Sequence, residues 1–310
     1  MSRYSKASAE ARDDLIQQMG EMLYDRIPES AELLDVGCST GYFGNLLQEY
    51  KNCVVDGVEI HKLDAKEAVK VLRKVYSFDI EHSWPADLLK KRYDIVFMGD
   101  VIEHVRFPDQ VLRVIAGLLK PGGAVLLSTP NIAHLSIRME LMKGNFKYES
   151  LGILDETHVK YFTRQSLLDF GEKAGLKAVK VGASIDDYSR GMVTGWLREV
   201  GLKPTEKFWK LADSRDARTY QFKVVFEVKK PGSKIKTIDI DLKPHQYKHQ
   251  YKLDIGAITE ELHSVKQQHV DLKIHAANLE NELNEIKSSS KYKLVQKAAK
   301  PVQIVRKIIK

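Results

Sequence analysis

Several features are scarce or missing in this chain of 310 residues, and each excludes a class of protein. No apolar run approaches the roughly 20 residues that a membrane-spanning helix needs. The segment Met1–Asp14 is polar and lacks the apolar core of a signal peptide. There are only two cysteines, Cys38 and Cys53, each beside or inside a predicted strand, and two buried thiols indicate a reducing compartment. We therefore expect a cytoplasmic protein.

Most of the chain also lacks an excess of either charge. Residues 287–310 hold eight of the 49 Lys and Arg residues and none of the 42 Asp and Glu residues. This leaves 41 basic and 42 acidic residues in 1–286, so the net charge of +7 belongs to the tail. Because the body is near neutral, its charge gives no general case for nucleic-acid binding, and we expect no nucleic-acid partner.

The most informative stretch is 33–44, which reads LLDVGCSTGYFG. An apolar run ends at Asp35, a turn from Gly37 to Gly41 follows, and a helix begins after it. Twenty-two residues after Gly37, Glu59 closes the next apolar run. This pattern predicts a strand–loop–helix unit that binds a nucleotide, with an acid at the tip of the second strand placed to bind ribose hydroxyls.

The glycines do not fit the dinucleotide fingerprint G-x-G-x-x-G, because Ser39 and Tyr42 stand where glycines are needed. The Asp35 carboxylate would also repel a pyrophosphate. S-adenosylmethionine has a sulfonium, an ammonium and no phosphate, so it tolerates this carboxylate. The segment resembles motif I of the class I S-adenosylmethionine-dependent methyltransferases, D-x-G-x-G-x-G, with Ser39 at the middle glycine.

The resemblance covers about 30–185 and implies roles for particular residues. Glu59 would hold the ribose, and Asp79 would accept a hydrogen bond from the adenine amino group. Asp35 and Gly37 would contact the methionine end, and the glycines, Gly41 included, let the backbone approach closely. At the end of the fourth strand, Gly99 and Asp100 would lie beneath the cofactor.

Alternating strand and helix patterns predict a doubly wound, mostly parallel sheet of seven strands inside a methyltransferase domain spanning 1–230. The predicted strands are 33–37, 53–59, 74–80, 93–99, 124–129, 177–183 and 220–228. An amphipathic lead helix is predicted at 8–30, and a helix after the fourth strand should stop at Lys120–Gly123. Residues 187–219 are predicted to be an inserted helical pair that serves as a lid, as an oligomer contact or as extra core packing.

The remaining residues differ in composition. Residues 231–252 are basic and polar, which indicates a linker with a short strand at 235–242. Residues 253–287 keep the 3,4 spacing of a heptad repeat and predict a coiled coil for self-association or for docking on another protein. The tail 288–310 mixes lysines with apolar residues, which suits either an anionic membrane surface or a solvated end.

Three segments carry candidate catalytic residues. They are Asp100–Val105, Pro130–His134 and Gly152–Thr163. The last two resemble the methyltransferase branch associated with bacterial surface polysaccharides (O-antigen type), in which P-N-x-A-H and D-x-T-H-x-x-x-F-T occur together. A neutral imidazole can remove the proton of an attacking hydroxyl. His158 is the first candidate for this base and His104 the second, although each could instead be structural.

One further interpretation, a divalent metal site, stays open but is not favoured. Methyltransferases of RNA ends, which the chain also resembles, hold a divalent metal with E-x-x-E-H and a later histidine. Here Glu103, His104 and His158 would be the ligands, with Asp100 in place of the first Glu. The leading hypothesis is a cytoplasmic O-methyltransferase, peripheral at the inner membrane face, that methylates a hydroxyl, or alternatively a phosphate, of a cell-surface glycan or its lipid-linked precursor. The alternatives are a metal-dependent RNA 2′-O-methyltransferase and a non-catalytic scaffold that binds S-adenosylmethionine.

Overall fold

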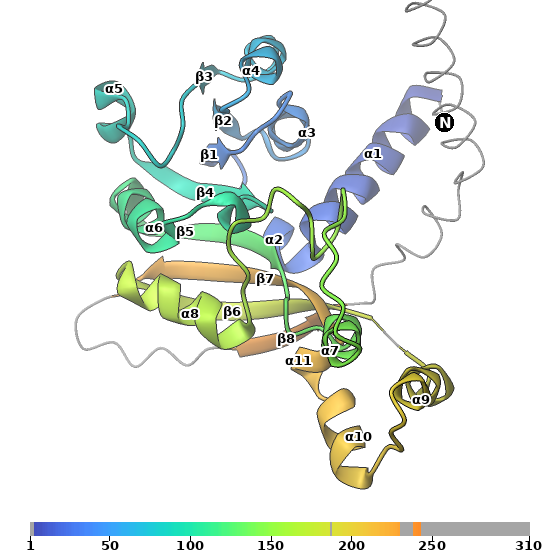
Figure 1. Cartoon of the computed structure of the whole chain (residues 1–310). Helices are drawn as coiled ribbons and strands as arrows, with labels where there is room; N and C mark the ends of the chain where they lie inside the picture. The colour runs from blue at the N-terminus through green and yellow to red at the C-terminus, as the bar shows by residue number, and fades with distance from the viewer. Residues whose placement is uncertain (1–2, 187, 230–237, 243–310) are drawn as a thin grey trace, which may run out of the picture. The chain divides into compact units, whose positions relative to one another are not determined.

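The computed structural model describes residues 3–186, 188–229 and 238–242, with side chains described for 11–186 and 188–229 (Figure 1). The chain divides into two units, Met1–His245 and Gln246–Lys310, and the architecture below is that of the first unit. The predicted coiled coil at 253–287, the tail at 288–310 and most of the linker at 231–252 lie outside the described residues. Within the described part of the chain, no helix is long and apolar enough to cross a membrane.

One mixed sheet organises the first unit, with the strand order β3-β2-β1-β4-β5-β7-β6-β8. Strands β1 to β5 are mutually parallel, and β7 lies antiparallel between β5 and β6. The predicted doubly wound sheet of seven strands is therefore confirmed. An eighth strand, β8, pairs in parallel with β6 and lies within the short strand expected at 235–242. The strands are β1 Glu32–Val36, β2 Val54–Val58, β3 Lys74–Tyr76, β4 Tyr93–Gly99, β5 Leu119–Pro130, β6 Leu176–Ile185, β7 Thr219–Val228 and β8 Ile238–Leu242.

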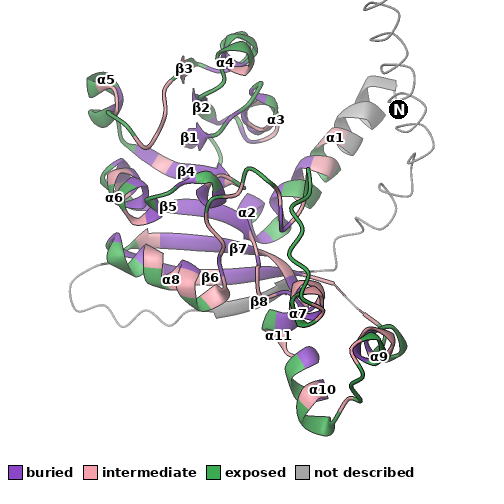
Figure 2. Cartoon of the chain, viewed as in Figure 1, coloured by how far each residue is buried: buried purple, intermediate pink, exposed green. Residues whose placement is uncertain are grey.

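Helices cover both faces of this sheet, so the central strands are buried on each side (Figure 2). In β4, Val96 and Met98 pack into one core, while Ile95 and Phe97 pack into the other. Because successive side chains of a strand point to opposite faces, a strand buried on both faces needs an unbroken apolar run. The helices are α1 Arg3–Met19, α2 Glu21–Arg26, α3 Tyr42–Lys51, α4 Lys62–Ala68, α5 Ala86–Leu89, α6 Pro108–Gly117, α7 Leu135–Met142, α8 Arg164–Lys173, α9 Arg190–Glu199, α10 Glu206–Ala212 and α11 Arg215–Arg218, with a 3₁₀ turn η1 at Ile102–His104.

The lead helix predicted at 8–30 is wrong as a single element. The chain forms α1 and α2 instead, which meet at Gly20 with φ of 89°. A Cβ atom at Gly20 would lie 2.7 Å from Cδ of Lys223, a buried residue of β7. The Lys223 Nζ atom donates a hydrogen bond to the carbonyl oxygen of Gln18, at 2.9 Å. The break between the helices therefore makes room for a lysine that lies about two hundred residues further along the chain. The apolar periodicity of residues 8–30 could not indicate this contact.

Two strand predictions also need correction. The third strand was predicted at 74–80 but ends at Tyr76. Phe78 and Ile80 prolonged the apolar pattern because they pack against the core from the following loop. The fifth strand was predicted at 124–129 and is longer, since β5 already begins at Leu119 and includes the Lys120–Gly123 segment predicted as a helix stop. Helix α6 ends before it, at Gly117.

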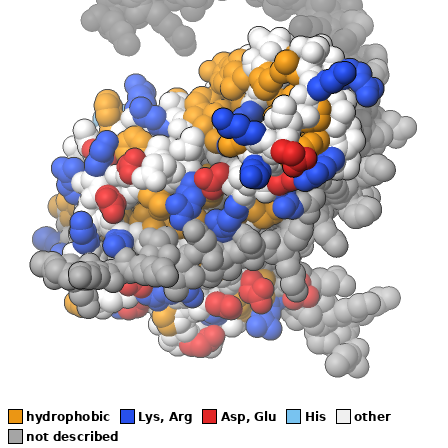
Figure 3. Space-filling view, turned by 90° about the horizontal axis from the view of Figure 1, so that it is seen from below, with side chains coloured by type: hydrophobic (Ala, Val, Ile, Leu, Met, Phe, Trp, Pro, Cys, Tyr) orange, Lys and Arg blue, Asp and Glu red, His pale blue; other side chains and the backbone are white. Residues whose placement is uncertain are grey.

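The predicted helical pair in 187–219 is confirmed as α9 and α10, and the short α11 follows. These helices build a small core of their own against α7, formed by Leu135, Met139, Val193, Leu197, Trp209, Ala212 and Ala217. The insertion lies at the lower end of the view in Figure 1 and faces the viewer in Figure 3, where hydrophobic side chains lie beside basic ones. The buried apolar residues of the insertion therefore form additional core, which was one of the three roles predicted for residues 187–219.

Candidate active site

The loop between β1 and α3 has the backbone that its glycines predicted. Gly37 and Gly41 have φ of 76° and 86°, and Ser39 has φ of 46°. The serine in the place of the middle glycine therefore also adopts the left-handed conformation. A Cβ atom at Gly37 would lie 2.5 Å from Cγ2 of Val101, so glycine is required at this position for close packing. Gly41 forms the N-cap position of α3.

Glu59 links this loop to the end of β2. The side chain is buried, and its two oxygens accept hydrogen bonds from the backbone N–H groups of Ser39 and His61, each at 2.8 Å. A carboxylate offers about four acceptor positions, so two remain for a ligand. Glu59 is thus held rigidly where the sequence predicted an acid for ribose hydroxyls.

A pocket of about 490 Å³ lies at the carboxyl ends of β1, β2 and β4. It brings together four predicted site residues, Gly37, Glu59, Asp79 and His104, from four different loops. The remaining lining is mostly apolar and consists of Val36, Val58, Ile60, Phe78, Ile80, Glu81, Val101 and Val105. The other predicted cofactor residues, Asp35, Gly41, Gly99 and Asp100, lie outside this lining. A largely apolar hollow with a few convergent polar groups is typical of a small-molecule site.

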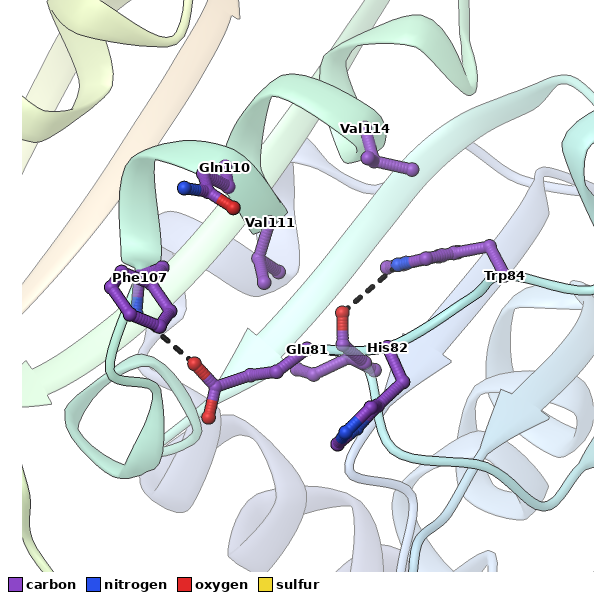
Figure 4. A pocket seen from close by; sticks show the side chains of 8 residues that line it. Glu81, His82, Trp84, Phe107, Gln110, Val111 and Val114 are labelled. Atoms are coloured by element: carbon purple, nitrogen blue, oxygen red, sulfur yellow. Dashed lines mark hydrogen bonds between the residues drawn. The ribbon is translucent and has the colours of Figure 1, made fainter.

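The Asp79 loop is fixed by contacts that no sequence pattern indicated. An oxygen of Asp79 accepts the backbone N–H of Glu81 at 2.8 Å. The Glu81 carboxylate accepts the N–H groups of Arg106 and Phe107, just before α6, and the Trp84 indole donates to the Ile80 carbonyl (Figure 4). Ile80, Glu81, Trp84 and Phe107 also line a second hollow, which shares Ile80 and Glu81 with the first. Glu81 therefore ties the loop that carries Asp79 to the turn that carries His104.

Asp35 is buried at the end of β1. Burial, followed by the neighbouring Glu59 charge, raises the pKa of the Asp35 carboxyl to about 7. A neighbouring cation stabilises the ionised form of such a carboxyl and so favours loss of its proton. This behaviour suits a sulfonium or ammonium ligand and opposes a phosphate.

Asp100 follows β4 directly and has φ of 52°, in the region that favours glycine. Its carboxylate accepts hydrogen bonds from the Ser128 hydroxyl at 3.0 Å and from the Gln221 side-chain amide at 2.7 and 2.8 Å. Its backbone N–H donates to the Ser128 carbonyl. Ser128 and Gln221 lie on β5 and β7, and neither was singled out from the sequence because cross-strand neighbours leave no local pattern.

The two candidate bases lie against each other. The rings of His104 and His158 have centroids 4.9 Å apart, edge to face. The Glu103 carbonyl accepts the N–H groups of Val159 and Lys160, each at 2.9 Å, which fixes the loop carrying His158 onto the turn after β4. Segments more than fifty residues apart thus form one histidine pair beside the pocket.

Hydrogen bonding sets the tautomer that each ring adopts in its neutral form. Nδ1 of His158 lies 3.1 Å from the Ile153 carbonyl, and Nδ1 of His104 lies 3.1 Å from the Thr157 carbonyl. A carbonyl oxygen only accepts, so in the neutral form of either ring Nδ1 carries the proton and Nε2 keeps its lone pair. Burial, and less strongly the His104 charge, lowers the pKa of His158 below its usual value. His158 is therefore neutral at physiological pH and able to accept a proton.

Glu103 is buried beneath these histidines. One oxygen accepts the Thr129 hydroxyl at 3.1 Å, while Oε1 has no hydrogen-bond partner and lies 4.0 Å from Nε2 of His158. Burial, with the Asp100 charge as a lesser cause, raises the pKa of Glu103 well above its usual range. One ligand atom each from Glu103, His104 and His158 lies within 4.8 Å of the other two, a spacing that could hold a metal ion.

The P-N-x-A-H segment is structural. Asn131 is fully buried and donates to the carbonyls of Asp216 and Thr219 at 2.7 and 2.8 Å, while its oxygen accepts the Ala133 N–H. His134 is also fully buried, and burial lowers its pKa to about 4. The segment therefore attaches the helical insertion to the end of β5.

This strand order, with a glycine loop after β1 and an acid after β2, defines a class I methyltransferase domain that uses S-adenosylmethionine. A family model described as a methyltransferase domain matches residues 5–181, more than half of the chain, and the chain belongs to that family.

Relatives were found among curated proteins and solved structures. The ubiquinone biosynthesis O-methyltransferase of Aeromonas salmonicida (strain A449) is 30% identical over 151 residues, which cover 46% of this chain and 62% of the relative. The protein of the same name from Hydrogenovibrio crunogenus is 28% identical over 167 residues, covering 51% and 66%. This chain thus spans less than two thirds of either relative. The crystal structure of a SAM-dependent methyltransferase from Archaeoglobus fulgidus superposes with a TM-score of 0.45 and 20% identity, covering 72% of this chain and 93% of that one.

Proposed function

We propose that this protein is an O-methyltransferase that transfers the methyl group of S-adenosylmethionine to a hydroxyl group. One observation carries the proposal: Gly37, Glu59 and Asp79 line the same pocket as His104, and His104 lies against the second imidazole, His158. The pocket thus offers groups for ribose and adenine next to a neutral base. The curated relatives support transfer to oxygen, since their names describe O-methyltransferases.

The reaction is an in-line displacement. The acceptor oxygen forms a bond to the methyl carbon while the carbon–sulfur bond breaks, and the bonding electron pair stays on sulfur. The hydroxyl proton passes to Nε2 of His158, whose Nδ1 proton is already donated to the Ile153 carbonyl. Because the cofactor is an activated methyl donor, alignment of the acceptor does much of the remaining work. His104 is the second candidate for the base.

For the acceptor, we propose a cell-surface glycan or its lipid-linked precursor, methylated at the inner membrane face. The support is the resemblance of Pro130–His134 and Asp155–Thr163 to the polysaccharide branch of the family. The same proposal gives 253–287 the role of a self-association segment and the basic tail the role of a contact with anionic lipid. The relatives' names instead point to ubiquinone biosynthesis, which makes a phenolic hydroxyl the competing acceptor class.

The test is label transfer from methyl-labelled S-adenosylmethionine by the full chain. Acceptors are the lipid-linked glycan fraction, the small-RNA fraction of the source cells and an alkyl catechol. We expect label in the glycan that survives a chelator and is lost in His158→Gln. Label in the catechol alone would move the acceptor class to phenols. Absence of cofactor binding would overturn the proposal as a whole.

A second chemistry is favoured by the cluster of Glu103, His104 and His158. One imidazole nitrogen from each histidine and an unpartnered carboxyl oxygen are suitable ligands for a divalent ion, and such an ion would act as a Lewis acid on the acceptor oxygens. Asp100, the fourth ligand that the RNA-end resemblance implies, has its carboxylate bound to Gln221 and Ser128. Loss of transfer with chelator, restored by Mg²⁺ or Mn²⁺, would establish this chemistry.

A further inference from the structure

A third hollow, of about 510 Å³, lies between α7 and the helical insertion. It is lined by Leu135, Tyr188, Val193, Trp209, Ala212, Asp213 and Arg218. No sequence motif indicated it, because its residues come from three separate stretches: the start of α7, the segment after β6 and the helices before β7.

The topology places this hollow on the same edge of the sheet as the cofactor pocket. β5 and β6 end at that edge, and the antiparallel β7 begins there. The cofactor pocket lies over β1, β2 and β4, whereas Leu135, Tyr188 and Arg218 belong to connections of β5, β6 and β7. Neighbouring strands are about 4.8 Å apart, so β7, two strands from β4, lies roughly 10 Å from the strand that leads to His104. A group bound here would belong to a part of the acceptor remote from the methylated hydroxyl.

The hollow is preformed. The small apolar core between α7 and the insertion includes Leu135, Val193 and Trp209, which also line the hollow. Asn131 fixes the end of the insertion by its hydrogen bonds to Asp216 and Thr219. A site that is already ordered binds its ligand without the entropic cost of closing a loop.

The chemistry of the walls combines aromatic rings with charged groups. Tyr188 and Trp209 supply the aromatic surface, while Asp213 and Arg218 supply an acceptor and donors. The Arg190 guanidinium lies 4.8 Å from the Trp209 ring centroid and donates to Asp213 at 2.8 Å, so Asp213 is oriented at the rim. A hydrocarbon chain here would desolvate the polar atoms of Asp213 and Arg218 without forming hydrogen bonds to them, which is costly. A sugar ring offers C–H faces for the aromatic walls and hydroxyls for Asp213 and Arg218.

We propose that this hollow is an acceptor subsite that binds a sugar ring at a distance from the hydroxyl that receives the methyl group. The inference rests on the proposed function and adds to it the residues that select the acceptor. An acceptor that reaches from the histidine pair to the hollow contains more than one ring, so single sugars bind weakly and longer oligosaccharides bind better.

The experiment measures binding of oligosaccharides released from the lipid-linked glycan fraction, by calorimetry, to the full chain saturated with S-adenosylhomocysteine. The pocket variants are Asp213→Asn and Arg218→Gln. The matched controls are Glu206→Gln and Lys210→Gln, which remove one charge of each sign from α10 at residues outside the hollow. Thermal unfolding of each variant checks that the insertion stays folded.

We expect each pocket variant to weaken oligosaccharide binding by about tenfold, as the loss of a charged hydrogen bond implies, with unchanged cofactor binding and unchanged binding in the controls. Equal binding by wild type and pocket variants would overturn the subsite while leaving the methyltransferase proposal intact. Binding of an alkyl catechol but of no oligosaccharide would overturn the carbohydrate assignment. If the wild-type chain does not bind the cofactor, the proposed function itself is wrong.

Discussion

The side-chain amide of Gln221, on β7, donates to both carboxylate oxygens of Asp100, at the end of β4, across the intervening strand β5. With the Ser128 hydroxyl, this holds a non-glycine residue at a φ of 52°. Such a conformation costs of order 1 kcal/mol or more and persists only where surrounding contacts impose it. The turn that carries Glu103 and His104 begins two residues later, at Ile102, so Gln221 acts as a positioning residue for the histidine pair.

We therefore predict that Gln221→Glu lowers kcat/KM about tenfold to a hundredfold, because two carboxylates would face each other. The double variant Asp100→Asn/Gln221→Glu restores an amide–carboxylate pair with the partners exchanged, and we expect it to recover most of the lost activity. Methyl-transfer kinetics and thermal unfolding measure both effects. The control is Gln165→Glu, which alters an exposed Gln–Asp pair of the same chemistry on α8. No recovery in the double variant would mean that the Asp100 carboxylate itself takes part in the reaction.

Cofactor binding should depend on the protonation of Asp35. With the pKa of this carboxyl at about 7, a cationic ligand favours the ionised form, so binding releases a proton and tightens as pH rises through about 7. Calorimetry at pH 6 and pH 8, in buffers of different ionisation enthalpy, measures both effects. Asp35→Asn should bind about tenfold more weakly, with no pH dependence. Wild-type affinity that is constant between pH 6 and pH 8 would contradict this role.

The same carboxyl should lower the stability of the ligand-free protein at neutral pH. Its folded pKa lies above the unfolded value of about 3.9, so the folded state binds more protons between pH 4 and 7. This contribution to the free energy of unfolding is therefore lost as pH rises through that window. Asp35→Asn removes the effect and should raise the melting temperature at pH 8 by several degrees, with little change at pH 4.

The pH profile of methyl transfer should report His158. Because the pKa of this imidazole is lowered, kcat should be flat above about pH 6.5 and fall only in more acidic solution. The charge of His104 contributes to the lowering, so His104→Gln should move the acid limb to higher pH. His158→Gln should lose about a hundredfold or more in kcat. The same pH profile in wild type and His104→Gln would show that the charge of His104 does not affect the catalytic titration of His158.

Asn131 should hold the insertion in place. Asn131→Ala leaves the Asp216 and Thr219 carbonyls without their side-chain donor, which should lower the free energy of unfolding by about 2–4 kcal/mol. Urea unfolding measures the loss, and limited proteolysis should show earlier cleavage within 188–218. Asn145→Ala is the matched control, because Asn145 is an exposed asparagine bonded to Glu140. Equal stability of the two variants would show that the insertion is held by its apolar core alone.

The sequence was most informative where a feature is local. The glycine loop, Glu59 and the nearly all-apolar strand β4 depend on neighbours along the chain, and each was predicted at its position. The histidine pair was predicted as two alternatives for one base, and the structure shows His104 and His158 in mutual contact. Local pattern also explains the confirmed helices of the insertion.

Features that depend on distant partners could not be predicted. Gly20 breaks the lead helix because Lys223 packs against it, and Gln221 reaches Asp100 across 121 positions of sequence. Asn131 and His134 belong to a segment that its place after the fifth strand and its resemblance to a methyltransferase branch predict to be catalytic. Their burial and partners show that they attach the insertion instead.

The reversed direction of β7 has a consequence for how this enzyme family can diversify. Because β6 and β7 form an antiparallel pair, the segment joining them starts and finishes at the ligand edge and crosses neither face of the sheet. The connecting segment, residues 186–218, can therefore be lengthened, shortened or replaced as a unit without disturbing the strands that carry the cofactor pocket. If the proposed acceptor subsite is correct, replacing this connecting segment changes the acceptor preference while Gly37, Glu59 and Asp79 stay the same.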